Sequence, residues 1–311
     1  MENVISVKNL SKKFTVKGKK EFIAVDDISF DIDRGEIISF IGPNGAGKST
    51  TIKMLIGILM PTSGDISVLG MNPSRDRQKL SYSLGTVFGQ KPQLWFHLPA
   101  IDSFRLLARI YNLDESAYQK QLKHLTEIFN LAEFLEQPVR KLSLGQRMRL
   151  EIAASLLHRP KIIFLDEPTI GLDITAKQKI RQYIKYINEK EQVTIFLTSH
   201  DVGDIEQLAQ RTIIINEGKL IFDDATTKLR DKYLKTKNIE IISANKAVSI
   251  KEKGFKTVET EEYKTKFEID TSIVSIEKAI NIIMAENSGI IDINIYDTPL
   301  EEIIAQIYVE K

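Results

Sequence analysis

A glycine-rich loop that ends in lysine and serine is the strongest chemical signal in this chain. It reads Gly42-Pro43-Asn44-Gly45-Ala46-Gly47-Lys48-Ser49 and fits the pattern G-x-x-x-x-G-K-[ST]. Glycines at these positions let backbone N–H groups converge on phosphate oxygens that a side chain would block. The Lys48 ammonium is expected to neutralise the β- and γ-phosphates of a nucleotide, and the Ser49 hydroxyl to ligate Mg²⁺.

The segments on either side of this loop fit a phosphate site. The apolar segment Ile37–Ile41 precedes it as a strand, and Ser49–Leu59 has the apolar spacing of a helix, closed by Met60-Pro61. The positive N-terminal end of that helix would point at the same anion. The alternative is a turn that only joins a strand to a helix, and the Lys48-Ser49 pair disfavours it.

An acidic pair follows another buried strand. Ile162–Leu165 is apolar and leads into Asp166-Glu167. Because neighbouring side chains at a strand end point to opposite sides, Asp166 is expected to face Mg²⁺ and Glu167 the position of an attacking water. Hydrolysis needs these two roles to be separate. The alternative is a pair of helix-capping carboxylates, which the phosphate loop upstream disfavours.

A second glycine turn, Leu142-Ser143-Leu144-Gly145-Gln146, completes the pattern. Together with Gly42–Ser49 and the run Leu165-Asp166-Glu167-Pro168-Thr169, it resembles the motifs of ABC-type ATPases, the motor subunits of ABC transporters. The resemblance covers about residues 3–225. It implies that the turn opens a helix, Arg147–Leu157, and binds the γ-phosphate of ATP held by another protomer.

The resemblance implies a larger set of site residues. Gln90 matches the family's glutamine that contacts Mg²⁺ and water, and His200 its switch histidine at the γ-phosphate. Asp173 matches the loop that crosses the dimer interface, and Phe14 the aromatic residue that stacks on adenine. The implied catalytic residues are Glu167, His200 and Gln90; the metal ligands are Ser49, Gln90 and Asp166; the nucleotide contacts are Phe14, Gly42, Pro43, Asn44, Gly45, Ala46, Gly47, Lys48, Ser49, Thr50, Ser143, Gly145, Gln146 and Asp173.

Four of these positions have ordinary alternatives. Gln90 can be a surface residue, His200 a structural histidine, Asp173 a helix cap ahead of Thr175, and Phe14 a core residue. One residue departs from the family pattern, since Leu144 stands where glycine is usual. A leucine there is tolerated if its φ is negative and its side chain faces away from the phosphate, which is what we expect.

The order of strands and helices indicates an α/β fold. The resemblance implies a P-loop NTPase core of the ABC ATPase type, with a mostly parallel sheet, an antiparallel β subdomain and an inserted helical subdomain at about 90–155. Residues 1–228 are assigned to this nucleotide-binding domain. The pattern changes after Thr226, where the Lys-rich, helix-like segment Lys228–Lys237 begins, and residues 229–311 are expected to form a small α+β accessory domain.

Composition limits the partners. The net charge is +1, with 43 Lys and Arg against 42 Asp and Glu, so no nucleic-acid partner is expected. The chain has no cysteine, no signal-peptide pattern and no apolar stretch long enough to cross a bilayer. We therefore expect a cytoplasmic protein, bound to the inner face of the membrane through a separate transmembrane permease.

A proline-bracketed loop is the candidate docking surface for that permease. Leu94, Trp95 and Phe96 lie between Pro92 and Pro99, and Trp95 is the only tryptophan. Apolar residues concentrated in a connecting loop favour an interface. The alternative is an aromatic plug between the helical subdomain and the core.

The function expected from the resemblance is ATP hydrolysis by a transporter subunit of the ABC-2-type exporter branch. It would work with a second copy of itself or a paralogous subunit, with two ATP and Mg²⁺ held between them. A soluble ABC ATPase that acts on ribosomes or nucleic acid is the alternative. Residues 230–311 are also compatible with a ligand-sensing or dimerising module that regulates the motor.

Overall fold

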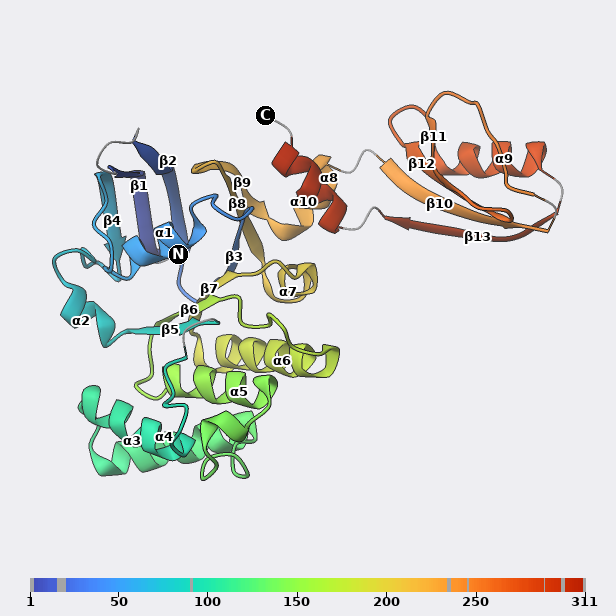
Figure 1. The fold of residues 1–311 in the computed structure, drawn as a ribbon. Helices are drawn as coiled ribbons and strands as arrows, with labels where there is room; N and C mark the ends of the chain where they lie inside the picture. The colour runs from blue at the N-terminus through green and yellow to red at the C-terminus, as the bar shows by residue number, and fades with distance from the viewer. Residues whose placement is uncertain are drawn as a thin grey trace. The chain divides into compact units, whose positions relative to one another are not determined.

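The computed structural model describes residues 3–15, 21–89, 92–233, 236–244, 246–287, 289–297 and 300–309. The chain forms two compact units, Met1–Thr226 and Thr227–Lys311 (Figure 1). Within the described ranges, no helix is both long and apolar enough to span a bilayer.

The first unit contains a central sheet whose described strands run in the order β5-β6-β7-β3-β8-β9. All neighbouring strands are parallel except β8 and β9, which form an antiparallel hairpin. This hairpin turns at Glu217-Gly218, where both residues have a left-handed φ. The strand bounds are β3 Ile37–Ile41, β5 Leu84–Phe88, β6 Ile162–Asp166, β7 Thr194–Thr198, β8 Arg211–Asn216 and β9 Lys219–Ala225.

The central strands are apolar on both faces because each face is covered. Phe164 and Phe196 pack on the side of α1 (Lys48–Leu55), in the cluster that also contains the small antiparallel sheet. Their neighbours Leu165 and Leu197 pack on the opposite side, against the helices. The Phe196 ring lies between Phe40 and Phe164, with centroid distances of 5.2 and 5.3 Å.

The small antiparallel sheet has the order β2-β1-β4 in the described residues. Its strands are β1 Asn3–Phe14, β2 Phe22–Asp33 and β4 Ser63–Val68. The second strand pairs with β1 as far as Phe22.

Two helices differ from their predicted bounds. α1 ends at Leu55, short of the predicted Leu59, because Gly57 takes a left-handed φ of 73° that turns the chain out of the helix. The helix predicted at Arg147–Leu157 is α5, Leu144–Ser155, and starts one turn earlier because Ser143 caps it.

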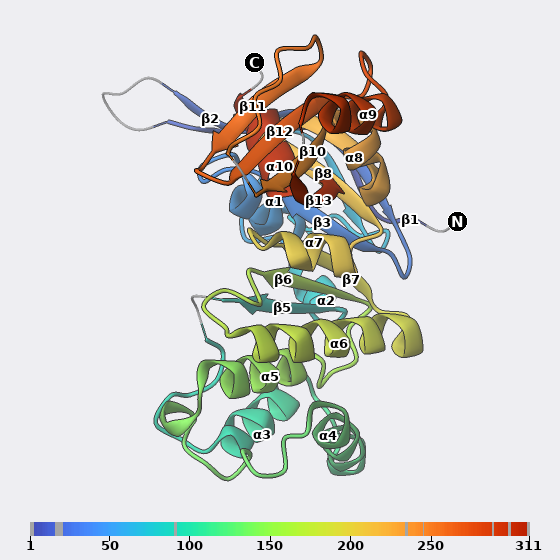
Figure 2. The same cartoon turned by 90° about the vertical axis from the view of Figure 1, so that its right-hand side faces the viewer.

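Helices stack outward from the central sheet. Figures 1 and 2 show α6 (Ile174–Glu191) and α5 next to the sheet, with α3 (Ala100–Ile110) and α4 (Glu115–Phe129) beyond them. α3, α4 and α5 lie within the predicted helical segment and bury Phe104, Leu125 and Phe129 completely. The remaining helical elements of the unit are α2 Arg77–Ser81, the short 3₁₀ turn Val139–Lys141 and α7 Val202–Leu208.

The second unit is α+β, with its described strands in the order β11-β12-β10-β13 and all pairs antiparallel. α9 covers one face and buries Ala279 and Ile283 against Ile239, Ile241 and Phe267. The elements are α8 Thr226–Tyr233, β10 Thr236–Ser243, β11 Phe255–Thr260, β12 Lys264–Asp270, α9 Ile276–Glu286, β13 Ile290–Asp297 and α10 Leu300–Val309.

Replacing Phe196 with alanine should destabilise the first unit by about 3–5 kcal/mol, because the cavity would lie between the packed rings of Phe40 and Phe164. Chemical denaturation of the purified chain measures this loss. The matched control is Tyr186→Ala on α6, whose side chain is 40% exposed; it should change stability by no more than about 0.5 kcal/mol. Equal effects of the two variants would contradict this view of the core.

Candidate nucleotide site

The phosphate loop lies where strand β3 meets helix α1, and packing fixes its shape. A Cβ on Gly42 would lie 2.1 Å from the Ile215 carbonyl oxygen of β8. A Cβ on Gly47, which has a φ of 109°, would lie 2.4 Å from the Ala24 carbonyl oxygen of β2. Both positions therefore require glycine. The loop is thus held between the two sheets, as a phosphate cradle requires.

Lys48 is buried at the base of this loop. Its Nζ donates to the carbonyl oxygens of Gly42 at 2.5 Å and Pro43 at 3.2 Å. Burial lowers the pKa of the Lys48 ammonium, while the nearby carboxylates of Glu167 and Asp166 act in the opposite direction. The ammonium therefore lies within the electrostatic reach of both acidic residues.

The first turn of α1 begins at Lys48 and places Ser49 and Thr50 beside the loop, with Ser49 exposed. The fully buried Thr51 donates from Oγ1 to the Gly47 carbonyl at 3.0 Å. Sequence reasoning assigned no role to Thr51, whose contact holds the last loop glycine against the helix.

Asp166 is the last residue of β6. Its Oδ1 accepts a hydrogen bond from Thr198 Oγ1 at 2.6 Å, across to the end of the neighbouring strand β7. Thr198 is fully buried and was not predicted to belong to the site. The available signal in the sequence was the position of Thr198 at the end of an apolar strand. That signal places Thr198 beside Asp166 only once β6 and β7 are known to be neighbouring strands.

Glu167 turns away from the strand direction with a left-handed φ of 56°. Its Oε2 accepts from the His200 backbone N–H at 3.2 Å, and its Oε1 lies 3.4 Å from His200 Nε2. Burial raises the pKa of the Glu167 carboxyl, and His200 partly opposes this shift. A desolvated carboxylate beside a histidine is a suitable group to orient a water molecule and to take its proton.

A buried polar network supports this edge of the sheet. The Asp204 carboxylate, fully buried on α7, accepts hydrogen bonds from Ser199 Oγ at 2.7 Å and Arg181 Nε at 2.7 Å. It also accepts from the Thr169 hydroxyl. The network therefore ties the segment after Glu167 to the segment before His200, and sequence reasoning missed it.

The second glycine turn, Leu142–Gln146, is called the signature turn from here on, and α5 the signature helix. Ser143 of this turn caps α5. Ser143 Oγ accepts from the Gln146 backbone N–H at 3.2 Å, and Gln146 Oε1 accepts from the Ser143 N–H at 2.8 Å. This capping box fixes the helix N-terminus. A Cβ on Gly145 would lie 2.9 Å from Ala176 Cβ, so glycine lets α5 approach α6 closely.

Leu144 fits this turn without a positive φ, because it is the first residue of α5. Its side chain packs against the helical core and points toward Gly171. The expectation that Leu144 has no positive φ is met. Leu144 also lines the hollow described below, so the expectation that its side chain faces away from the phosphate stays a prediction. A leucine is therefore compatible with the turn geometry.

Two helix N-termini share one hollow of about 300 Å³. Ser143 caps α5, and Asp173 caps α6 by accepting from the Ala176 N–H at 2.8 Å. Arg149 and Lys179 also line the hollow. Two positive helix ends and two cationic side chains suit it to an anion, which remains a prediction. None of the phosphate-loop residues lines it.

The other predicted residues are placed as follows. Gln90 lies outside the described residues. Phe14 is half-buried at the end of β1, with the Lys12 ammonium 5.1 Å from its ring centroid. Trp95 and Phe96 are 50% and 45% exposed, so the plug interpretation is wrong for both; the buried member of the loop is Leu94.

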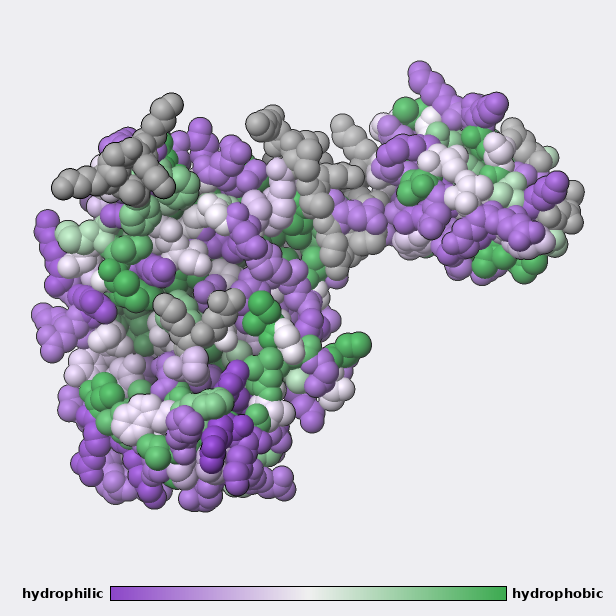
Figure 3. All heavy atoms as spheres, in the orientation of Figure 1, coloured by the Kyte–Doolittle hydropathy of each residue, from purple (hydrophilic) through white to green (hydrophobic). Residues whose placement is uncertain are grey.

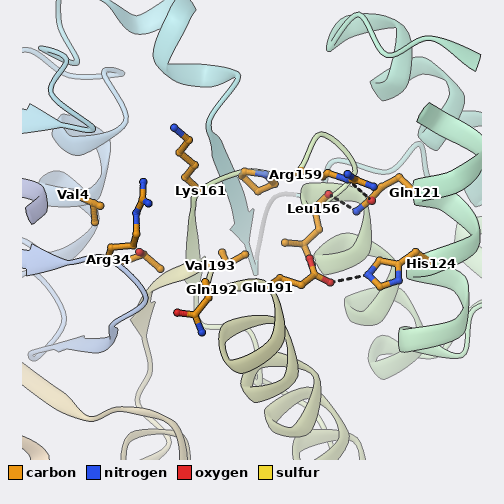
Figure 4. A pocket seen from close by; sticks show the side chains of 12 residues that line it. Val4, Arg34, Gln121, His124, Leu156, Arg159, Lys161, Glu191, Gln192 and Val193 are labelled. Carbon is orange, nitrogen blue, oxygen red and sulfur yellow. Dashed lines mark hydrogen bonds and ion pairs between the residues drawn. The ribbon is translucent and has the colours of Figure 1, made fainter. Parts of the chain in front are cut away.

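A larger hollow of about 480 Å³ lies at the other end of the central strands, where β6 and β7 begin (Figure 4). Lys161 and Val193, which line it, immediately precede β6 and β7, whereas Asp166 and Thr198 are the last residues of these strands. His124 Nε2 and Glu191 Oε1 meet within it at 2.9 Å. None of the predicted site residues lines this hollow.

Comparison with known proteins identifies this arrangement. The family model described as ABC transporter matches residues 25–170. The bacitracin transport ATP-binding protein BcrA of Bacillus licheniformis is 33% identical over 82% of this chain and 80% of its own length. NatA of Bacillus subtilis is 32% identical over 73% of the chain and 91% of its own length. The chain belongs to the ABC transporter family.

Further ABC proteins support this assignment. YbhF, a probable multidrug ABC transporter ATP-binding protein of Escherichia coli, is 38% identical over 220 residues. The match covers 71% of the chain and 37% of YbhF. The dimeric, ADP- and phosphate-bound ATP-binding cassette MJ0796 superposes with a TM-score of 0.64 and 27% identity, over 71% of the chain and 98% of the cassette.

Membership in the ABC family confirms the predicted fold class and the predicted activity. The chain is the ATP-binding, ATP-hydrolysing subunit of an ABC transporter. Nothing in the comparisons supports the alternative of an ATPase that acts on ribosomes or nucleic acid.

Replacing Glu167 with glutamine should stabilise this ABC subunit at neutral pH. Burial raises the folded-state pKa above the ordinary value of 4.5, so ionising Glu167 costs folding free energy as the pH rises through the folded pKa. The variant should be more stable than the parent at about pH 8, and the difference should shrink toward about pH 5.

Denaturant unfolding across this pH range measures the effect. Replacing the exposed Glu127 on α4 with glutamine serves as the control and should show no comparable gap at the higher pH. A Glu167→Gln protein with the parent's stability at every pH would contradict the burial argument.

Proposed function

We propose that this chain drives an ABC-2-type exporter by closing with a second ATPase subunit around two ATP molecules. The observation that carries the proposal is the separation of two complementary half-sites. The phosphate loop, Asp166 and Glu167 form one, and the hollow between Ser143 and Asp173 forms the other, with no phosphate-loop residue in its lining. ATP bound to the first half-site of one copy would present its γ-phosphate to the second half-site of the other copy.

The surface beside the second half-site supports such closure. Ile170 and Ile174, on either side of the Gly171–Asp173 loop, are 44% and 77% exposed. Two isoleucines exposed next to an anion site favour burial against a partner protein. The second copy would cover them as its nucleotide enters the hollow.

The residues present fit Mg²⁺. Ser49 offers a hydroxyl at the start of α1, and the Asp166 carboxylate is oriented by Thr198. Hard oxygen ligands of this kind, together with phosphate oxygens, are what Mg²⁺ prefers. A bound Mg²⁺ would neutralise charge on the phosphates. Glu167 would orient the attacking water and accept its proton, with His200 holding the Glu167 carboxylate in place.

The direction of transport and the cellular location are part of the proposal. Export is supported by the relatives named as bacitracin and probable multidrug transporter proteins. The subunit would lie on the cytoplasmic face of the membrane, attached through the permease.

The permease docking surface would include the loop that carries Trp95 and Phe96. Leu98 of the same loop is 39% exposed, and Ile110, the last residue of α3, is 54% exposed. Figure 3 shows hydrophobic residues scattered among hydrophilic ones over the helical subdomain, in the lower part of the view. Apolar surface with exposed aromatic residues is typical of binding hot spots.

ATP-driven closure should depend on the ability of the Ser143 turn to bind the negatively charged γ-phosphate. Ser143→Asp should keep α5 capped, because aspartate caps helices as well as serine does, but should repel the γ-phosphate. In a Glu167→Gln background, which should bind ATP and stall hydrolysis, light scattering should show dimers with ATP and monomers once Ser143→Asp is added. The control Ser143→Ala loses the cap, at a cost of about 1 kcal/mol, without adding charge. Undiminished dimerisation of Ser143→Asp would overturn the proposed closure.

Trp95→Ala should release the permease while leaving the ATPase subunit folded. The side chain is half exposed, so its loss should cost little stability, whereas loss of an interface aromatic costs about 2 kcal/mol or more of binding. Affinity purification from detergent-solubilised membranes should recover a multi-spanning polypeptide with the parent and much less with the variant. Tyr186→Ala, on the exposed surface of α6, is the control. Full recovery with Trp95→Ala would place docking elsewhere.

A further inference from the structure

Glu151 is a buried carboxylate outside the nucleotide site. It lies in α5 and is 4% exposed. Its Oε2 accepts from the Gln93 backbone N–H at 3.0 Å, and its Oε1 from the Leu94 N–H at 3.3 Å. One side chain of the signature helix therefore holds two consecutive peptide groups of the loop that leads to Trp95.

Side chains also fix the rest of this loop. The Trp95 N–H donates to Ser103 Oγ of α3 at 3.0 Å, and the Leu94 side chain is buried in the helical core. Gln93 donates from its side chain to the Thr86 carbonyl of β5. Three successive amides, those of residues 93–95, are thus held by side chains from two helices. The position of Trp95 depends on Glu151 and Ser103.

Helix α5 connects these two hydrogen bonds to the second half-site, the hollow between Ser143 and Asp173. Glu151 follows the Ser143 cap by eight residues, a distance of about 12 Å along one helix axis at 1.5 Å per residue. A helix moves as a rigid rod over this length. A shift of the Ser143 end therefore moves the Glu151 carboxylate, and with it the two peptide groups that it holds.

Burying the Glu151 carboxylate costs free energy, and its two hydrogen bonds partly offset that cost. Burial raises the pKa of Glu151, while the two backbone donors and the nearby Arg147 oppose that shift. An apolar residue of similar size would avoid the desolvation of a charge, but it would leave the Gln93 and Leu94 N–H groups without their acceptor. Glu151 is therefore suited to holding the loop rather than to filling the core.

We propose that Glu151 is a positioning residue that couples the signature helix to the permease-docking loop. When α5 engages the ATP of the second copy, Glu151 carries the loop at residues 93–98 with it and moves Trp95 and Phe96. This inference rests on the proposed closure around ATP.

The single tryptophan makes the coupling measurable. Trp95 fluorescence is recorded in the Glu167→Gln background with and without ATP, while light scattering follows dimerisation in the same samples. In the parent of this series, dimerisation should shift the Trp95 emission. Glu151→Ala should dimerise with ATP and lose the emission shift. Glu151→Gln retains one acceptor oxygen and should recover part of it.

Ser103→Ala is the matched control, since it removes the other anchor of the loop without touching α5. It should change the resting emission and keep the ATP-dependent shift. Hydrogen exchange gives an independent readout. In Glu151→Ala the Gln93 and Leu94 amides should exchange roughly ten- to a hundredfold faster, as expected for the loss of hydrogen bonds to a charged acceptor.

The outcomes separate this inference from the proposed function. If the Glu167→Gln protein dimerises while Trp95 emission stays constant, the coupling is overturned and the ATP-driven closure stands. A full emission shift in Glu151→Ala, or in Glu151→Gln should the alanine variant fail to fold, also overturns it. Failure of the Glu167→Gln protein to dimerise with ATP counts against the closure and against the coupling that rests on it.

Discussion

The parallel register of β3, β6 and β7 is the constraint on which the nucleotide site depends. Parallel strands end at the same edge of a sheet, so the phosphate loop after Ile41, the acidic pair after Leu165 and His200 after β7 are brought together although the sequence separates them widely. The Thr198–Asp166 hydrogen bond is the direct consequence, because it joins the ends of two neighbouring strands. A shift of β7 by one residue would remove that bond and turn Phe196 out of its aromatic stack.

Short-range patterns were sufficient to predict the phosphate loop and the strands beside it, because their chemistry is carried by neighbouring residues and a strand period. The Ser143 turn was predicted through its resemblance to the ABC motifs, and the helix cap made by Ser143 was found only in the structure. The structure adds a second reason for Gly42 and Gly47, because carbonyl oxygens of other strands leave no room for a Cβ at either position, and the phosphate argument did not predict these contacts.

Contacts between distant segments were not predictable in the same way. The Asp204 network joins residues from three segments, and nothing near Asp204 in the sequence shows that Arg181 will face it. β11 is not evident from the sequence, because its residues after Phe255 are exposed and the strand lacks an apolar alternation. The end of α1 was misplaced because apolar spacing continued past Gly57, while the backbone conformation of that glycine ended the helix.

The left-handed φ of Glu167 sets protein stability against turnover at this one position. A non-glycine residue in that conformation costs free energy whatever its side chain, and burial of the carboxylate adds to the cost. Glycine would relieve both burdens and, given the proposed role of Glu167, would end hydrolysis. Libraries sorted for heat resistance alone would thus accumulate inert proteins at this position, whereas lineages that depend on transport must retain the strained acid and compensate elsewhere in the fold.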